Sequence, residues 1–160
     1  MELSIIKNKI HNIQGNKVIF DFDLAQLYEV ETRVLKQAAR RNLKRFPKDF
    51  MFQILKEEWK EVVTNCDNLP ENIKFSPTTP FAFTEQGVAM LSSILNSDKA
   101  IDVNISIMRA FVALRQHLTD YSNLKEHIAQ LEKEMNIKFK DIHQALNYLL
   151  LQFVEVLQII

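Results

Sequence analysis

The sequence has few of the residues on which several classes of protein depend. Its 160 residues include only two glycines, Gly15 and Gly87, so no glycine-rich loop that cradles a phosphate can form. The single cysteine, Cys66, excludes an internal disulfide framework. The four histidines show no metal-ligand spacing; they are His11, His117, His127 and His143. We therefore expect no enzymatic activity, no metal, no cofactor and no small-molecule substrate.

Long apolar runs are also missing. No uninterrupted apolar run is long enough to span a bilayer, and the N-terminus lacks the apolar centre of a signal peptide. The formal net charge is zero, which argues against a general polycation. The apolar content is that of a globular protein, with room for one core of about 100–150 residues plus an appendage. We expect a protein of the reducing cytoplasm without membrane contact.

Against this neutral background, residues 21–49 combine two patterns. The first is a short helix, a break and a longer helix, which is the arrangement of a helix-turn-helix. Ala25 is small where the second helix would pass close to it, and Val30 would fill the gap beneath the turn. The positions expected to pack the two helices are Leu24, Ala25, Tyr28, Val30, Leu35 and Ala38.

The second pattern is a run of positive charge that no acidic residue interrupts. Steps of three and four place Arg33, Lys36, Gln37, Arg40 and Lys44 on one helix face. Lysine and arginine attract phosphates, arginine can fork onto guanine and glutamine can pair with adenine, so this face suits a major groove. The alternative is a basic face that meets only solvent. The candidate DNA contacts are Thr32, Arg33, Lys36, Gln37, Arg40, Arg41, Lys44, Arg45 and Lys48.

The stretch before this region predicts a β-hairpin. Side chains that favour strands flank Gly15, which adopts a positive φ at low cost, so residues 9–13 should pair with residues 17–20. Asn16 and Lys17 would form the tip of the hairpin. The tip either touches a DNA backbone or only faces solvent.

Local signals also place the ends of the two helices. Asp21 is expected at the N-cap position of the first helix, where its carboxylate would accept free backbone N–H groups. The second helix, at residues 32–45, should end near Arg45 or Phe46 because Pro47 disfavours helical geometry in the residue before it.

The following residues predict a small sheet with a helix and a loop between its strands. Alternating apolar residues indicate a strand at 50–54, and residues 81–83 form a second short strand that could pair with it. Helical spacing runs through residues 55–65. Residues 65–80 contain three prolines and no apolar period, so they form a loop that either orders on DNA or stays mobile.

Two further helices should follow the second strand. Thr84 is the expected N-cap of the first, and Gly87 in its first turn suggests a close backbone approach. Residues 96–98 break this helix and cap another, which continues to about Leu118.

Several blocks of the sequence, in order and at natural spacing, resemble a known family. VIFDFDLAQLYEVET, RNLKRFPKDFMFQI, PFAFTEQGVAMLSSILNSDKAI and VNISIMRAFVALR are similar to the KilA-N-related DNA-binding domain of phage and mobile-element proteins. The branch is ORF-N, named after the N-terminal domain of a phage open reading frame, and the resemblance covers about residues 5–118. It implies an α+β DNA-binding domain of phage antirepressors and similar regulators, without enzymatic activity, metal or nucleotide. It also implies that the helix at 32–45 faces DNA.

The chain departs from the family at two places. Glu29 stands where the family usually has glycine, and a positive φ there would cost glutamate about 1 kcal/mol. Residues 65–80 lack the arginine- and glycine-rich character of the family, which weakens a DNA-contacting role for this loop.

Residues 119–160 lie outside the resemblance. After a polar break at 119–123, with Ser122 as a cap, a helix without proline or glycine should run to the end over roughly 60 Å. Its apolar residues recur at steps of three and four, with one four–four stutter, as in a heptad seam. The seam residues are Ile128, Leu131, Met135, Phe139, Ile142, Leu146, Leu149, Phe153, Val156 and Ile160.

A helix of this length finds no equal partner within the chain. Pairing with another copy, as a coiled coil or small bundle, is the economical arrangement. The alternative is that it packs back onto its own domain. A membrane-surface helix is less favoured because the last turns carry almost no basic residues.

The sequence thus predicts an α+β fold with two parts. Residues 1–118 form the DNA-binding domain, with a hairpin, a helix-turn-helix, a small sheet and further helices, and residues 119–160 form the long oligomerising helix. The expected function is regulation by DNA binding, with a basic helix in the major groove and a dimer formed through the C-terminal helix. Its partners would be double-stranded DNA and a second copy. The alternative is an antirepressor-type module that binds a repressor or another protein.

Overall fold

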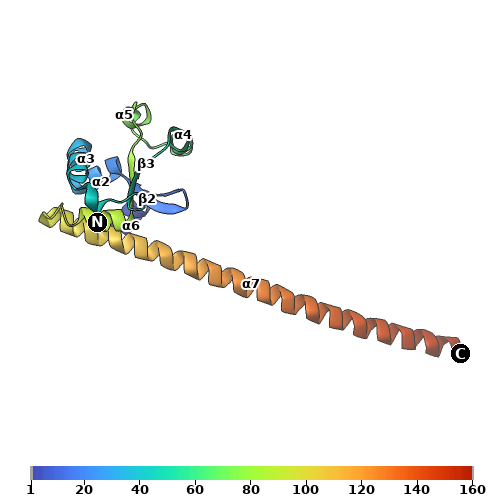
Figure 1. Cartoon of the computed structure of the whole chain (residues 1–160). Coiled ribbons are helices and arrows are strands. Elements are labelled where there is room, and N and C mark those ends of the chain that lie inside the picture. Colours follow the sequence, from blue (N-terminus) through green and yellow to red (C-terminus); the bar gives the residue numbers. More distant parts are fainter. Residues whose placement is uncertain (1, 160) are drawn as a thin grey trace. The chain divides into compact units, whose positions relative to one another are not determined.

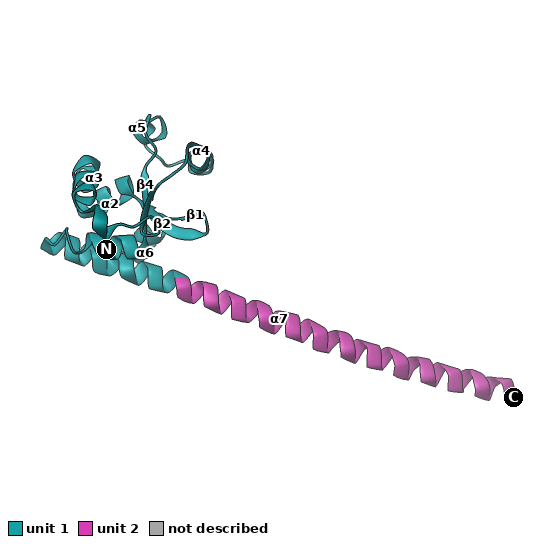
Figure 2. Cartoon of the chain, viewed as in Figure 1, with its two compact units in different colours: residues 1–114 teal, residues 115–160 magenta. Residues whose placement is uncertain are grey.

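The computed structural model describes residues 2–159, which form two compact units. Unit 1 extends to Leu114 and unit 2 begins at Arg115 (Figure 2). The fold confirms the predicted α+β class with a long C-terminal helix (Figure 1). In chain order the elements are α1 (Leu3–Lys7), β1 (Ile10–Ile13), β2 (Asn16–Phe20), α2 (Asp21–Tyr28), α3 (Thr32–Arg41), η1 (Leu43–Arg45), β3 (Met51–Gln53), α4 (Lys56–Asn65), α5 (Glu71–Lys74), β4 (Phe81–Thr84), α6 (Glu85–Leu91) and α7 (Asp98–Ile159).

The predicted N-terminal hairpin is present, but its turn is one step earlier than expected. β1 pairs antiparallel with β2 and ends on the pair Ile13↔Asn16. Gln14 and Gly15 form the turn with φ of 53° and 76°, as a two-residue type I′ turn requires at both positions. Asn16 and Lys17 therefore lie in β2 and not at the tip. The short helix α1 precedes the hairpin, where the sequence gave no helical signal.

The four strands form one antiparallel sheet in the order β1-β2-β4-β3. The predicted pairing of β3 with β4 is confirmed, and β4 also pairs with β2. Ile19, Phe83 and Met51 are opposite one another across three strands and belong to one apolar cluster. The next row includes Phe20 and Ala82, which belong to a second cluster. The period of two along each strand thus directs alternate side chains into two cores.

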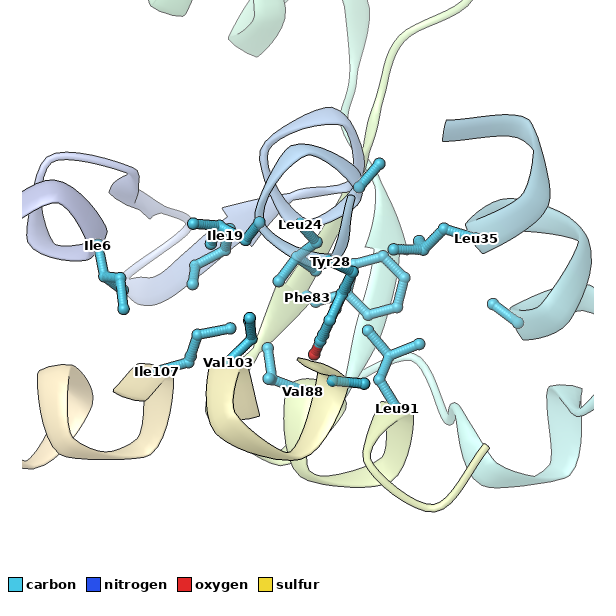
Figure 3. Packing of buried hydrophobic residues seen from close by; sticks show 14 of the residues in the cluster. Ile6, Ile19, Leu24, Tyr28, Leu35, Phe83, Val88, Leu91, Val103 and Ile107 are labelled. Carbon is cyan, nitrogen blue, oxygen red and sulfur yellow. The ribbon is translucent and has the colours of Figure 1, made fainter. Parts of the chain in front are cut away.

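The first core joins the sheet to α2, α3, α6 and the beginning of α7 (Figure 3). Its polar connection is the Tyr28 hydroxyl, which donates to Oδ1 of the buried Asn104. Burial raises the pKa of the Tyr28 phenol, so the group keeps its proton and remains a donor. The fully buried members include Ile6, Ile19, Leu24, Leu35, Val88, Leu91 and Ile107.

The second core lies on the opposite side of the sheet, beneath α4 and α5 (Figure 1). Trp59 of α4 packs edge-on against Phe20, with ring centroids 5.6 Å apart. Ile73 of α5 packs against the same cluster. The predicted helix α4 is confirmed, whereas α5 is a single turn within the segment that was predicted to be a loop. Its burial of Ile73 is a tertiary contact without a local sequence period.

The entry into α6 confirms both expectations about its first turn. The N–H of Gly87 donates to Oγ1 of Thr84 at 3.3 Å, so Thr84 is the N-cap. A Cβ built on Gly87 would lie 2.2 Å from the carbonyl oxygen of Phe50, which is closer than atoms can approach. α7 then begins after Ser97, whose Oγ accepts the N–H of Ala100 at 3.2 Å. The expected break between the two helices is therefore present.

The expected break at residues 119–123 is absent, because α7 runs without interruption from Asp98 to Ile159. Thr119 remains compatible with the helix because its hydroxyl donates to the carbonyl of Arg115, one turn earlier, at 3.1 Å. Ser122 is consequently an interior residue and not a cap. The predicted seam residues up to Val156 are all exposed in the single chain, and Ile160 lies outside the described residues. None of the helices within residues 2–159 combines the length and apolarity needed to cross a bilayer.

Candidate nucleic-acid interface

The basic region is built on α2 and α3, which pack against each other and the sheet. Leu24, Ala25 and Tyr28 of α2 are buried, as is Leu35 of α3, and Val30 packs partly buried against the same core. These contacts agree with the expected packing of two helices around a short turn. Ala38 is only half-buried, and Ala39 takes the deeper position.

Glu29 ends α2 in the left-handed conformation, with φ 57° and ψ 41°. Its N–H donates to the carbonyl of Gln26 at 3.2 Å, and the N–H of Val30 donates to that of Ala25 at 3.0 Å. These two hydrogen bonds make a Schellman motif, in which glycine usually takes this position. Glutamate therefore carries the strain of about 1 kcal/mol that its Cβ implies. Its carboxylate lies 2.9 Å from Nζ of Lys99 at the surface.

α3 ends at Arg41, earlier than the predicted Arg45 or Phe46. Asn42 leaves helical geometry with φ −124°, while its side-chain amide donates to the carbonyl of Ala38 at 2.9 Å. The chain then turns through the 3₁₀ helix η1 so that Phe46 can pack on the ring of Phe83. Burial of this ring decides the end of the helix before Pro47 acts. Lys44 and Arg45 therefore belong to η1 and do not continue the face of α3.

The two sides of α3 have opposite character. Leu35 and Ala39 are buried at 0% and 2% exposure, while Arg33, Gln37 and Arg40 are exposed. A shallow hollow of about 470 Å³ follows the outer side. Its lining residues are Thr32, Arg33, Lys36, Gln37 and Arg40. Five of the candidate contacts thus share one concave surface.

Lys36 differs from the other cations of this surface because it is tied to the domain. Its Nζ lies 3.2 Å from Oδ2 of the buried Asp21, and that oxygen also accepts the N–H of Phe81 at 3.0 Å. Phe20 occupies the N-cap position of α2 without a side-chain bond, so the prediction of Asp21 as the cap is wrong. The carboxylate instead joins two elements that are distant in sequence. The Phe81 ring also lies 6.0 Å from the guanidinium of Arg40.

The other candidate contacts are distributed around this surface. Arg33 makes a loose ion pair of 3.8 Å with Glu31, and both side chains are largely exposed. Nη1 of Arg45 donates to Oγ of Ser93 at 2.9 Å, which ties η1 to the chain after α6. Arg41, Lys44 and Lys48 are exposed. The sequence did not indicate Asp21 and Phe81 as the supports of this surface, because their contacts with α3 are tertiary.

A second polar cluster lies at the hairpin. Nζ of Lys9 lies 3.0 Å from Oδ1 of Asp23 and donates to Gln26 at 2.8 Å. Burial raises the pKa of Asp23, against the opposing effect of its bond to Lys9. Burial also lowers the pKa of His11, which stacks on Phe20. Within the described residues, no group of three or more His, Cys, Asp or Glu side chains is placed to hold a metal ion.

Comparison with known families gives one match. A sequence model of the ORF6N domain matches residues 8–94. This agrees with the resemblance to a phage open-reading-frame N-terminal domain, while the wider relation to KilA-N domains stays a prediction. Comparison with curated proteins and with solved structures found no match.

Proposed function

We propose that this chain, which belongs to the ORF6N domain family, is a DNA-binding regulatory protein of phage or mobile-element origin. The two-sided character of α3 carries the DNA-binding part of the proposal. Its buried side fixes the helix to the core, and its outer side offers arginine and glutamine around a hollow. In this proposal α3 enters a major groove, and the protein acts in the cytoplasm in an antirepressor-like role without an enzymatic step.

The chemistry of the outer side suits both parts of DNA recognition. Arg33 and Arg40 can fork onto guanine or a phosphate, and Gln37 can pair with adenine. Lys36 would present an ammonium group whose position Asp21 and Phe81 restrict, which favours a phosphate contact of fixed register. Together the cations of one copy would neutralise about four to six phosphates, so affinity should fall steeply with salt.

Unit 2 supports the dimeric part of the proposal. Its apolar side chains are exposed at every predicted seam position within the described residues, for example 49% at Ile128 and 63% at Phe139. Covering such a row against a second copy removes apolar surface from water. Two α3 helices held in this way would contact half-sites about one helical turn of DNA, or a multiple of it, apart if the dimer is two-fold symmetric.

The test is a gel-shift titration of the full chain with random-sequence duplex DNA at several salt concentrations. Arg40→Ala/Lys44→Ala should abolish measurable binding, because two exposed cations beside the groove are lost. A matched control, Lys138→Ala/Lys140→Ala, removes two exposed cations from unit 2 and should bind like the wild type.

Circular dichroism and sedimentation should show that the double variant keeps its helical content and its oligomeric state. Binding equal to that of the wild type would refute the proposal. If the alanine pair unfolds the domain, Arg40→Gln/Lys44→Gln retains the aliphatic stems and answers the same question.

A second candidate is a module that binds a repressor or another protein. The observation favouring it is that four consecutive residues, 148–151, are all large, apolar and about 60% exposed. Four consecutive positions surround the helix, and a single two-stranded seam covers only part of that circumference. A pull-down from host lysate beside the gel shift separates the two. Specific protein capture without DNA binding would favour the second candidate.

A further inference from the structure

Phe75 is the most exposed large apolar side chain among the described residues of unit 1, with 81% of its surface open to solvent. It directly follows α5, in the segment for which the sequence gave two alternatives. A single exposed apolar residue is common on protein surfaces and carries no function by itself. Its support and its neighbours distinguish this one.

The segment holds the Phe75 ring outward on a folded support. Ile73, two residues earlier, packs into the second core and anchors α5. The N–H of Phe75 itself donates to the carbonyl of Glu71 at 3.0 Å. Pro70 and Pro77 restrict the backbone on either side. An exposed ring on such a turn loses little conformational freedom when it meets a partner.

The neighbours of Phe75 belong to the same surface as α3. A small hollow of about 190 Å³ is lined by Thr32 and Lys36 of α3 and, from the other side, by Ile73 and Ser76. Thr32 and Lys36 also line the larger hollow along the outer side of α3. Phe75 lies between Ile73 and Ser76 in the chain, with Lys74 immediately before it. The exposed ring is therefore next to the cationic surface.

We infer that Phe75 is an apolar wedge that enters a base step of the DNA beside the groove occupied by α3. The inference rests on the proposed function and adds a second contacting element to it. A cationic surface with one aromatic ring held out from it is complementary to a polyanion whose interior is a stack of aromatic bases. Insertion of the ring would partly unstack one step and bend the duplex.

The wedge predicts a change that ionic contacts do not produce. The duplexes are those that the full-length wild type enriches from a random-sequence pool, labelled at both ends for energy transfer. Phe75→Ala should weaken binding about tenfold and reduce the bend. The slope of log affinity against log salt should not change, because no phosphate contact is lost.

Two variants calibrate this result. Lys74→Ala should lower the salt slope by about 1 if its ammonium group meets a phosphate, which shows that the assay resolves single ionic contacts. Ile105→Ala truncates another exposed apolar side chain, in α7, and should change neither affinity nor bend. Phe75→Trp should retain binding, since a larger aromatic ring can stack in the same place.

Failure of the inference differs from failure of the proposed function. If the wild type enriches no duplex, both are refuted. If the wild type binds and folded Phe75→Ala matches it in affinity and bend, the wedge is refuted and DNA binding through α3 stands. A Phe75→Ala variant whose salt slope falls would equally refute the wedge, because the loss would then be ionic.

Discussion

Unit 1 and unit 2 use the same kinds of apolar side chain in opposite ways. Phe20 and Phe83 of unit 1 are 0% and 1% exposed between a sheet and its helices, whereas Phe139 and Phe153 of unit 2 are 63% and 62% exposed. Unit 1 contains the elements that bury its own apolar surface. Unit 2 is one helix, so its side chains lack a second element of the same unit to pack against. An apolar period along a helix therefore indicates a buried side, but it does not say whether the cover comes from the same chain.

The largest expected difference between the units is in the cost of removing one aromatic ring. Phe83→Ala should destabilise unit 1 by about 3–5 kcal/mol, because it removes a fully buried ring from the first core. Phe139→Ala should leave the unfolding of unit 1 unchanged and weaken self-association. Fluorescence of Trp59, which belongs to unit 1, follows denaturant unfolding, and sedimentation follows association. Equal losses of unit 1 stability in both variants would refute the contrast.

A smaller effect is expected from adding one methyl group. Gly87→Ala should destabilise unit 1 by about 1–3 kcal/mol, because its Cβ would overlap the backbone oxygen of Phe50. Ala129→Val adds two methyl groups at an exposed position of unit 2 and should cost under about 1 kcal/mol. The measurement is the denaturant midpoint of each variant. A tolerated Gly87→Ala would mean that α6 can move away from β3.

The left-handed turn of unit 1 gives a finer test. Glu29→Gly should relieve about 1 kcal/mol of backbone strain. Loss of the surface pair with Lys99 and the greater freedom of glycine in the unfolded chain offset part of this gain. We expect a net stabilisation below about 1 kcal/mol in thermal or denaturant unfolding. Glu29→Ala, which removes the ion pair and keeps the strain, is the matched control and should not stabilise.

The smallest expected effect concerns pH. Burial lowers the pKa of His11 below its usual 6.5, so between the two values the unfolded chain binds more protons than the folded one. The contribution of His11 to stability is therefore complete above pH 6.5 and falls as the pH falls below it. His11→Gln should remove this part of the slope, while His143→Gln, an exposed position of unit 2, should not. Nearby Asp23 opposes the effect of burial and Lys9 adds to it.

Local patterns predicted the elements whose causes are local. The hairpin around Gly15, the strands β3 and β4, the Thr84 cap and the close approach at Gly87 all follow from a few adjacent residues. The two-sided pattern of α3 also places its buried and exposed residues correctly. The role of those exposed residues in DNA binding, and of the seam in dimerisation, stays a prediction.

The sequence failed where a distant contact or a neutral preference decided the structure. Asp21 has the chemistry of a cap, but it bonds instead to Phe81, 60 residues away. α3 stops at Arg41 because Phe46 turns inward, which a helical period cannot show. Residues 119–123 are polar but contain neither proline nor glycine, so nothing in them breaks the helix. The one-turn helix α5 depends on the burial of Ile73.

The bond from Asp21 to Phe81 has a consequence for how α3 is aimed. One buried carboxylate oxygen holds both the backbone of β4 and the ammonium group of Lys36. The attitude of the basic helix is thereby indexed to the sheet rather than to the short turn before it. A mutation or a bound partner that shifts this strand end would rotate the whole row of cations together, and two distant segments of sequence thus share control of one reading angle.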